Sequence, residues 1–134
     1  MTELCYVIPL TPVSKKNSQQ IVRTAGGRPF IMPSKQYRAY EEAAAWYLRP
    51  RPPKPITEPV NVCCVFYMPT RRLCDLSNLE EAAHDVLVRC GVLADDNRDI
   101  VATTDGSMVL YDKDHPRTEI TITAKEGWQQ WRKR

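Results

Sequence analysis

The sequence predicts one domain of the α+β (mixed α/β) class, in which two main helices pack on a small mixed β-sheet. The chain has 134 residues, the length of a single domain that buries about two-thirds of its unfolded surface. Hydrophobic residues make up 43% and charged residues 26% of it, as is typical of a globular protein. The spacing of hydrophobic residues along the chain predicts, in order, a strand, a hairpin, a helix, a strand, a helix and three strands. We therefore treat residues 1–134 as one domain.

The first half of the chain is expected to hold a strand, a hairpin and a helix. Residues 4–10 mix β-branched and aromatic side chains and end among prolines, which is typical of a strand. Two adjacent glycines separate the β-prone runs 21–24 and 29–32 and predict a hairpin. Apolar residues then recur at helical spacing over residues 34–48, and Ser34 at the start of this range can cap the helix. The proline-rich residues 49–55 predict a stiff surface connection.

The second half is expected to begin with the central strand of the sheet. Residues 60–68 are apolar on much of both faces, as a central strand would be. A second helix is expected over residues 77–90, with Gly91 just past its end. Ser77 and Glu80 match the S-x-x-E capping box. The remaining predicted elements are strands over 100–103, 106–111 and 118–123, a turn over 113–116 and a short helix over 128–134.

Two helices cannot cover both faces and both edges of such a sheet. Association of two identical chains buries the uncovered surface, and closed dimers are the commonest symmetric assembly. We therefore expect a homodimer.

The charges are distributed unevenly along the chain. Residues 11–55 carry nine basic residues against two acidic ones, a net charge of +7. Residues 70–115 carry ten acidic residues against five basic ones, a net charge of −5, and the chain ends in Arg132-Lys133-Arg134. Basic outer segments around an acidic middle suit a protein that holds a polyanion near a group of carboxylates. Ordinary solvated charge accounts for the same distribution.

Several classes of protein are not expected. The apolar runs are too short to cross a bilayer, so no membrane partner is predicted. The first residues lack a basic segment before an apolar stretch, so we expect no export signal and a cytoplasmic, reducing location. The five cysteines are odd in number and include no C-x-x-C pair, which argues against a zinc site or a disulfide framework.

Carboxylates gather around the predicted second helix. Asp75 lies just before the helix, and Asp95-Asp96 lie just before the strand expected near residue 100. The polar stripe of the helix carries Asn78, Glu81 and Asp85. Acids at a helix entrance and in a loop before a strand can converge, and Mg²⁺ takes carboxylate oxygens together with water and substrate phosphate. The sequence therefore indicates magnesium chemistry on a phosphodiester.

Each of these residues also has a purely structural interpretation. Asp75 fits a turn, Asp95-Asp96 a polar loop, and Asp85 an ion pair with Arg89 four residues on. The two histidines are expected to be structural or exposed. Packing is expected for the aromatic residues of the first helix, Tyr37, Tyr40, Trp46 and Tyr47.

Two stretches match a longer pattern. Pro12-Val13-Ser14-Lys15-Lys16-Asn17 matches a P-x-S-x-x-N-like opening. A second stretch keeps order and spacing without a gap over Asp75, Asn78, Leu79, Asp85, Val86, Leu87, Gly91, Val92, Leu93, Asp95 and Asp96, with Ile100 beyond it. Together they resemble the RusA family of Holliday-junction resolvases, small dimeric endonucleases frequent in phages and prophages.

The resemblance implies a homodimeric, Mg²⁺-dependent endodeoxyribonuclease of DNA recombination and repair. It would resolve four-way (Holliday) junctions by paired phosphodiester hydrolysis, with Mn²⁺ as a possible substitute ion. Asp75 and Asp96 are then the first candidates for metal ligands. We expect DNA backbone contacts from Lys15, Lys16, Asn17, Arg71, Arg72 and Asn78, and therefore binding that weakens steeply as salt rises.

The sequence departs from the family pattern at two positions. The second aspartate of the family's D-x-D is Ser77 here, and the lysine needed for cleavage is Glu81. These changes shift the local charge by about two units toward negative, which opposes the approach of phosphate unless a metal is bound. One interpretation is that Glu81 joins Asp75 and Asp96 as a ligand, with Asp95 and Asp85 as further catalytic candidates. The other is a protein that binds branched DNA and cleaves it poorly.

Overall fold

The computed structural model describes residues 3–14, 19–23, 26–27, 29–33 and 35–125. The elements in this part are β1 (Leu4–Ile8), β2 (Gln19–Arg23), β3 (Pro29–Pro33), α1 (Lys35–Ala45), β4 (Val60–Met68), α2 (Leu76–Arg89), β5 (Val101–Thr103), β6 (Met108–Tyr111) and β7 (Arg117–Ala124). Two helices on a five-stranded mixed sheet confirm the predicted α+β class. The expected C-terminal helix over 128–134 lies outside the described residues. No helix in the described part has the length and apolar character needed to cross a membrane.

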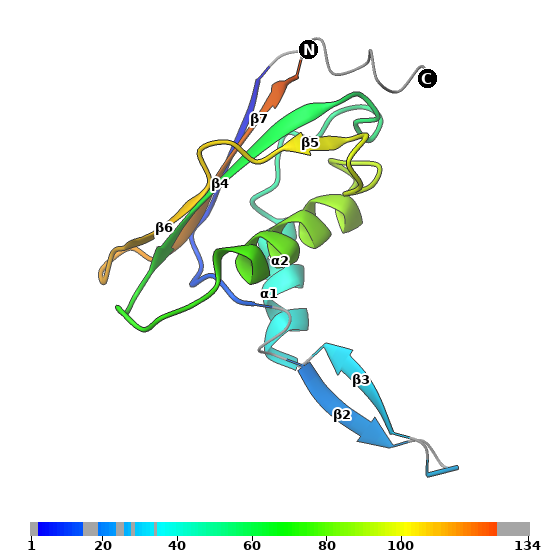
Figure 1. The fold of residues 1–134 in the computed structure, drawn as a ribbon, viewed down its shortest axis with the longest axis vertical. Coiled ribbons are helices and arrows are strands. Elements are labelled where there is room, and N and C mark those ends of the chain that lie inside the picture. Colours follow the sequence, from blue (N-terminus) through cyan, green and yellow to red (C-terminus); the bar gives the residue numbers. More distant parts are fainter. Residues whose placement is uncertain (1–2, 15–18, 24–25, 28, 34, 126–134) are drawn as a thin grey trace.

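β4 is the centre of the main sheet, as predicted. The strand order is β1-β7-β4-β5, and β6 pairs with the other end of β4. β7 runs antiparallel to both β1 and β4, whereas β5 and β6 run parallel to β4. Figure 1 shows α1 and α2 on one side of this sheet, and the β2–β3 hairpin extending away from it beyond the start of α1. The hairpin confirms the prediction from the paired glycines.

The core lies between β4 and the helices. Val60, Val62, Cys64 and Phe66 alternate along β4 and are almost fully buried. They share one cluster with the buried side chains of α2, which recur at helical spacing: Leu79, Ala83, Val86 and Leu87. The other face of β4 is only half-buried. A central strand apolar on both faces was expected, but no described helix lies on that second face.

α2 begins one residue earlier than expected, and its N-cap is Asp75 rather than a capping box at Ser77. Asp75 has the extended backbone of an N-cap, with φ −91° and ψ 123°, but its side chain makes no capping bond. Instead its Oδ2 accepts a hydrogen bond from Nδ2 of Asn78 at 3.2 Å. Ser77 therefore lies exposed inside the first helical turn. At the other end Gly91 has φ +79° and follows the C-cap, as predicted.

The proline-rich connection after α1 has no helix or strand, as predicted. Arg51 holds it against the helix, because its Nε donates to the Leu48 carbonyl at 3.0 Å and its Nη2 to the Ala45 carbonyl at 2.8 Å. The second bond satisfies the carbonyl of the last residue of α1, and the first holds the turn that follows it. Directly afterwards Ile56 forms a β-bridge with Leu93.

The aromatic residues of the first helical region divide into two groups. Tyr37 and Tyr40 are buried, which confirms the packing role expected of them. Packing was the wrong prediction for Trp46 and Tyr47, which are 70% and 43% exposed. The reason is that α1 ends at Ala45, so the helical spacing no longer directs these two rings toward the core.

We expect Leu87→Ala to lower the free energy of unfolding by about 2–5 kcal/mol, because a fully buried leucine leaves a cavity when it is truncated. The matched control is Leu73→Ala, whose side chain is 102% exposed, and we expect a change within about 0.5 kcal/mol. Urea unfolding of the three proteins at one concentration measures both values. Equal destabilisation by the two variants would contradict this description of the core.

Candidate active site

The first candidate residue, Asp75, lies where the loop after β4 enters α2. Its carboxylate is exposed and accepts the hydrogen bond from Asn78 described above. Two predicted site residues are therefore in direct contact. The Asp75 side chain makes no capping bond, so its carboxylate does not accept from the first N–H groups of α2.

The Asp95-Asp96 pair lies in a loop that is anchored on the residues before it. Ile56 N donates to the Val92 carbonyl at 2.9 Å, and Ala94 N donates to the Ile56 carbonyl at 3.0 Å. Asp95 is occupied within the loop, since its carboxylate accepts from Asp96 N at 2.7 Å and from Asn97 Nδ2 at 3.1 Å. Asp96 is exposed. Of the two acids, Asp95 thus has a carboxylate held by hydrogen bonds within the loop, whereas the carboxylate of Asp96 is exposed.

One flank of α2 faces the loop that carries Asp96. Glu80 and His84 lie one turn apart on this flank. Burial lowers the pKa of His84, while the negative charges of Glu80 and Asp96 act in the opposite direction and raise it. Nε2 of His84 is buried and has no hydrogen-bond partner among the described residues. Asp96 is therefore within electrostatic reach of the middle of α2.

The opposite flank of α2 faces α1. Asp85 Oδ2 accepts a hydrogen bond from Tyr37 Oη at 2.9 Å, and burial together with this carboxylate raises the pKa of Tyr37. Arg89 Nε lies 3.5 Å from Asp85 Oδ2 and 3.3 Å from Glu41 Oε2. The ion pair between Asp85 and Arg89, expected as a structural alternative, is confirmed. The polar stripe predicted for this helix is thus divided, with Asp85 directed to α1 and Glu81 exposed to solvent.

Arginines of the β4–α2 loop precede Asp75. Arg71 and Arg72 are exposed, and the guanidinium of Arg71 lies over the ring of Tyr111 at 4.5 Å from its centroid. Lys15, Lys16 and Asn17, the other predicted DNA contacts, lie outside the described residues. The contact with Tyr111 was not foreseen, because nothing in the sequence pairs residue 71 with residue 111.

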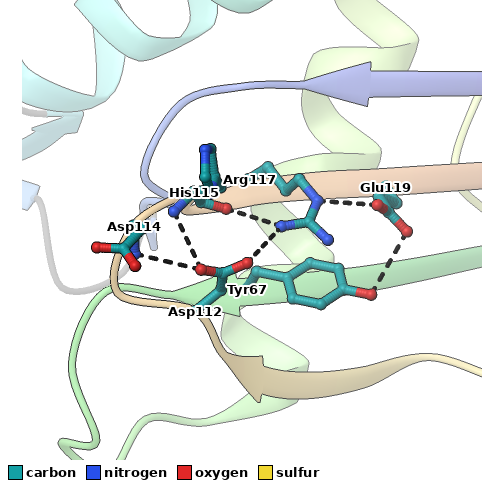
Figure 2. Close-up of polar contacts among 6 residues, drawn as sticks. All are labelled: Tyr67, Asp112, Asp114, His115, Arg117 and Glu119. Atoms are coloured by element: carbon teal, nitrogen blue, oxygen red, sulfur yellow. Dashed lines mark hydrogen bonds and ion pairs between the residues drawn. The ribbon is translucent and has the colours of Figure 1, made fainter.

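A second arginine–tyrosine stack, also not foreseen, joins β4, β7 and the turn between β6 and β7 (Figure 2). Arg117 lies 3.7 Å from the centroid of the Tyr67 ring. Two of its three nitrogens donate to nearby acceptors: Nε to Glu119 at 2.8 Å, and Nη1 to Asp112 and to the His115 carbonyl, both at 2.9 Å. An open pocket of about 480 Å³ next to this turn is lined by Pro9, Leu10, Thr11, Asp114, His115, Pro116 and Arg117 and by none of the predicted metal ligands.

A comparison with protein-family models decides the family. The model described as endodeoxyribonuclease RusA matches residues 9–123, which is most of the chain. The chain belongs to the RusA family of endodeoxyribonucleases. The match spans both acidic segments, from Asp75 to Asp96, and the loop with Arg71 and Arg72. A search of curated proteins finds no match.

RusA-family nucleases generally depend on a divalent metal ion, so the donor set of this chain can be tested for fit. The exposed carboxylates of Asp75 and Asp96 are hard oxygen donors of the kind that Mg²⁺ prefers. Within the described residues, however, no three His, Cys, Asp or Glu side chains are grouped closely enough to hold an ion. The donor types of Asp75 and Asp96 therefore fit a hard divalent ion, and the ligand set of Asp75, Asp96 and Glu81 stays a prediction.

The Arg117 network predicts a pH dependence of stability. The hydrogen bond from Arg117, and then that from the His115 backbone, hold the pKa of Asp112 below its ordinary value of 3.8. Because the pKa is lower in the folded state, ionised Asp112 contributes stability that is complete above the ordinary pKa and is lost as the pH falls through the folded-state pKa. Arg117→Leu should therefore raise the Asp112 midpoint in a carboxyl NMR titration and weaken the loss of stability below about pH 4. Arg72→Leu, an exposed control, should leave the midpoint in place; equal midpoints in all three proteins would contradict the assignment.

Proposed function

We propose that this RusA-family chain is a structure-selective endodeoxyribonuclease that cleaves four-way DNA junctions as a homodimer with Mg²⁺. The observation that carries the proposal is the family match over residues 9–123, which includes the spaced acids Asp75 and Asp96. A four-way junction has approximate two-fold symmetry, so two identical subunits could cut it at two related positions.

Asp75 and Asp96 are proposed to hold the ion, with Glu81 as the third ligand. A bound Mg²⁺ polarises the phosphodiester and lowers the pKa of the attacking water. The exposure of all three carboxylates supports this proposal, since ligands of a DNA-bound ion must be open to the duplex. Asp95 and Asp85 are further catalytic candidates, although both carboxylates already accept hydrogen bonds within the protein, Asp95 from Asp96 N and Asp85 from Tyr37.

DNA contact is assigned to basic and amide side chains that precede or adjoin the acids in the sequence. Arg71 and Arg72 precede Asp75 and are exposed, and Asn78 already contacts its carboxylate. Lys15, Lys16 and Asn17 complete the proposed contacts to the backbone. Cationic side chains near a carboxylate site attract the polyanion and offset the local negative charge.

Asp75→Asn should lower the rate of junction cleavage in Mg²⁺ by at least about 100-fold, because it removes an anionic ligand and keeps the side-chain volume. Junction binding measured in Ca²⁺ should remain within about twofold of the parent. Asp114→Asn, an exposed aspartate in the β6–β7 turn, is the control and should cleave at the parent rate. Cleavage by Asp75→Asn at the parent rate would refute the role of this carboxylate.

A second candidate function is binding of branched DNA without efficient cleavage. It is favoured by Ser77 and Glu81, which replace the carboxylate and the lysine of the family pattern, and by the lack of a grouped ligand triad among the described residues. Binding a labelled junction in Ca²⁺ and then exchanging to Mg²⁺ or Mn²⁺ separates the two functions. Product supports the nuclease, whereas a stable shifted complex without product supports the binding protein.

Restoring the family pattern should increase cleavage. In Ser77→Asp combined with Glu81→Lys we expect a rate at least about tenfold above the parent, because the change adds a ligand at the helix start and removes negative charge one turn later. The double variant Ser77→Asn with Glu81→Gln has the same positions changed without the new charges and is the control. An unchanged rate in the first variant would mean that these two positions do not limit activity.

A further inference from the structure

The loop that carries Arg71 lies against the end of an edge strand of the sheet. β6 pairs only with β4 in the described part, and its last residue, Tyr111, is in register with Met68 at the end of β4. Residues side by side in a parallel pair point to the same face of a sheet. Met68 packs against the core, so Tyr111 belongs to the face that carries α2. Tyr111 is 44% exposed there, and the guanidinium of Arg71, in the loop from β4 to α2, lies over its ring.

The stack on Tyr111 leaves the hydrogen-bonding edge of Arg71 open. The guanidinium carbon is 4.5 Å from the ring centroid, which is within the range of a cation–π contact. Such a contact uses the flat face of the guanidinium, whereas its N–H donors lie in the plane and point outward. Arg71 makes no ion pair with any described carboxylate. Its donors therefore remain available for an anion from outside.

Other stacked arginines show why Arg71 differs. Arg117 is closer to its ring, but it forms ion pairs with Asp112 and Glu119, so its charge is already neutralised within the protein. Arg49 lies 4.8 Å from the centroid of Trp46, just beyond the end of α1. Arg71 combines a ring contact, open donors and a position four residues before Asp75.

We propose that Tyr111 is a positioning residue for DNA: its ring holds Arg71 with the guanidinium edge directed to a backbone phosphate beside Asp75. The inference rests on the proposed function, because it assumes that a nucleic-acid backbone reaches this loop. A long arginine side chain that is already oriented loses less conformational freedom when it binds phosphate in a bidentate manner. Tyr111 thus acts through Arg71 and needs no contact with DNA of its own.

The test is a double-mutant cycle on affinity for a labelled four-way junction in Ca²⁺. Tyr111→Leu should weaken binding about twofold to fivefold, in line with a partly exposed cation–π contact. Tyr111→Phe should bind like the parent, because it keeps the ring face. Arg71→Gln should weaken binding and lower its salt dependence by about one phosphate contact. In this Arg71→Gln background, Tyr111→Leu should cause no further loss of affinity.

Tyr47→Leu is the matched control, since Tyr47 is 43% exposed and lies beyond α1 without a stacked arginine among its described contacts. It should not change junction affinity, and thermal unfolding should show all variants folded. An equal loss for Tyr111→Leu with and without Arg71, or a Tyr111→Phe variant as weak as the leucine variant, would overturn the positioning role while leaving the nuclease proposal intact. A parent protein that binds no junction at low salt would overturn both.

Discussion

The packing of α2 on the buried face of β4 is the contact on which the rest of the structure depends. Leu79, Val86 and Leu87 fill the space against β4, and this fixes the rotation of the helix about its own axis. The rotation then decides what each polar side chain meets. Asp85 is directed to Tyr37 of α1, whereas His84, one residue earlier, lies on the opposite flank, where the negative charge of Asp96 raises its pKa against the effect of burial. A small change in this packing would exchange the neighbours of every carboxylate on the helix.

The main elements could be predicted because hydrophobic periodicity and turn residues are local signals. The alternation in β4, the helical spacing in α2 and the glycine after it all correspond to the observed elements. The predicted start of α2 was one residue too late, because both Asp75 and Ser77 can cap a helix. The capping-box pattern at Ser77 does not reveal that Asp75 is the N-cap. The exposure of Trp46 was missed because α1 ends just before it, and the spacing of apolar residues does not mark that end, where Arg51 donates to the Ala45 carbonyl.

The candidate site could be predicted in its residue types and spacing but not in its contacts. Asp75 and Asp96 are recognisable because their separation along the chain follows a family pattern. The stack of Arg71 on Tyr111 joins a loop to a strand forty residues away, and it depends on the register of β6 with β4. No local property of either residue encodes that register. The same holds for the stack of Arg117 on Tyr67, which depends on the register of β7 with β4, although the acids that pair with Arg117 are close to it in sequence.

The bridge between Ile56 and Leu93 links the proline-rich segment to the acidic loop. Before Ile56 the chain is stiffened by closely spaced prolines, and after Leu93 it continues directly into the acidic loop. Two backbone hydrogen bonds, from Ile56 N to Val92 O and from Ala94 N to Ile56 O, hold the start of that loop against Ile56. An insertion or deletion in the proline-rich segment would therefore disturb the pairing of Ile56 and, through it, the loop that carries Asp95 and Asp96, although no residue of that segment belongs to the site.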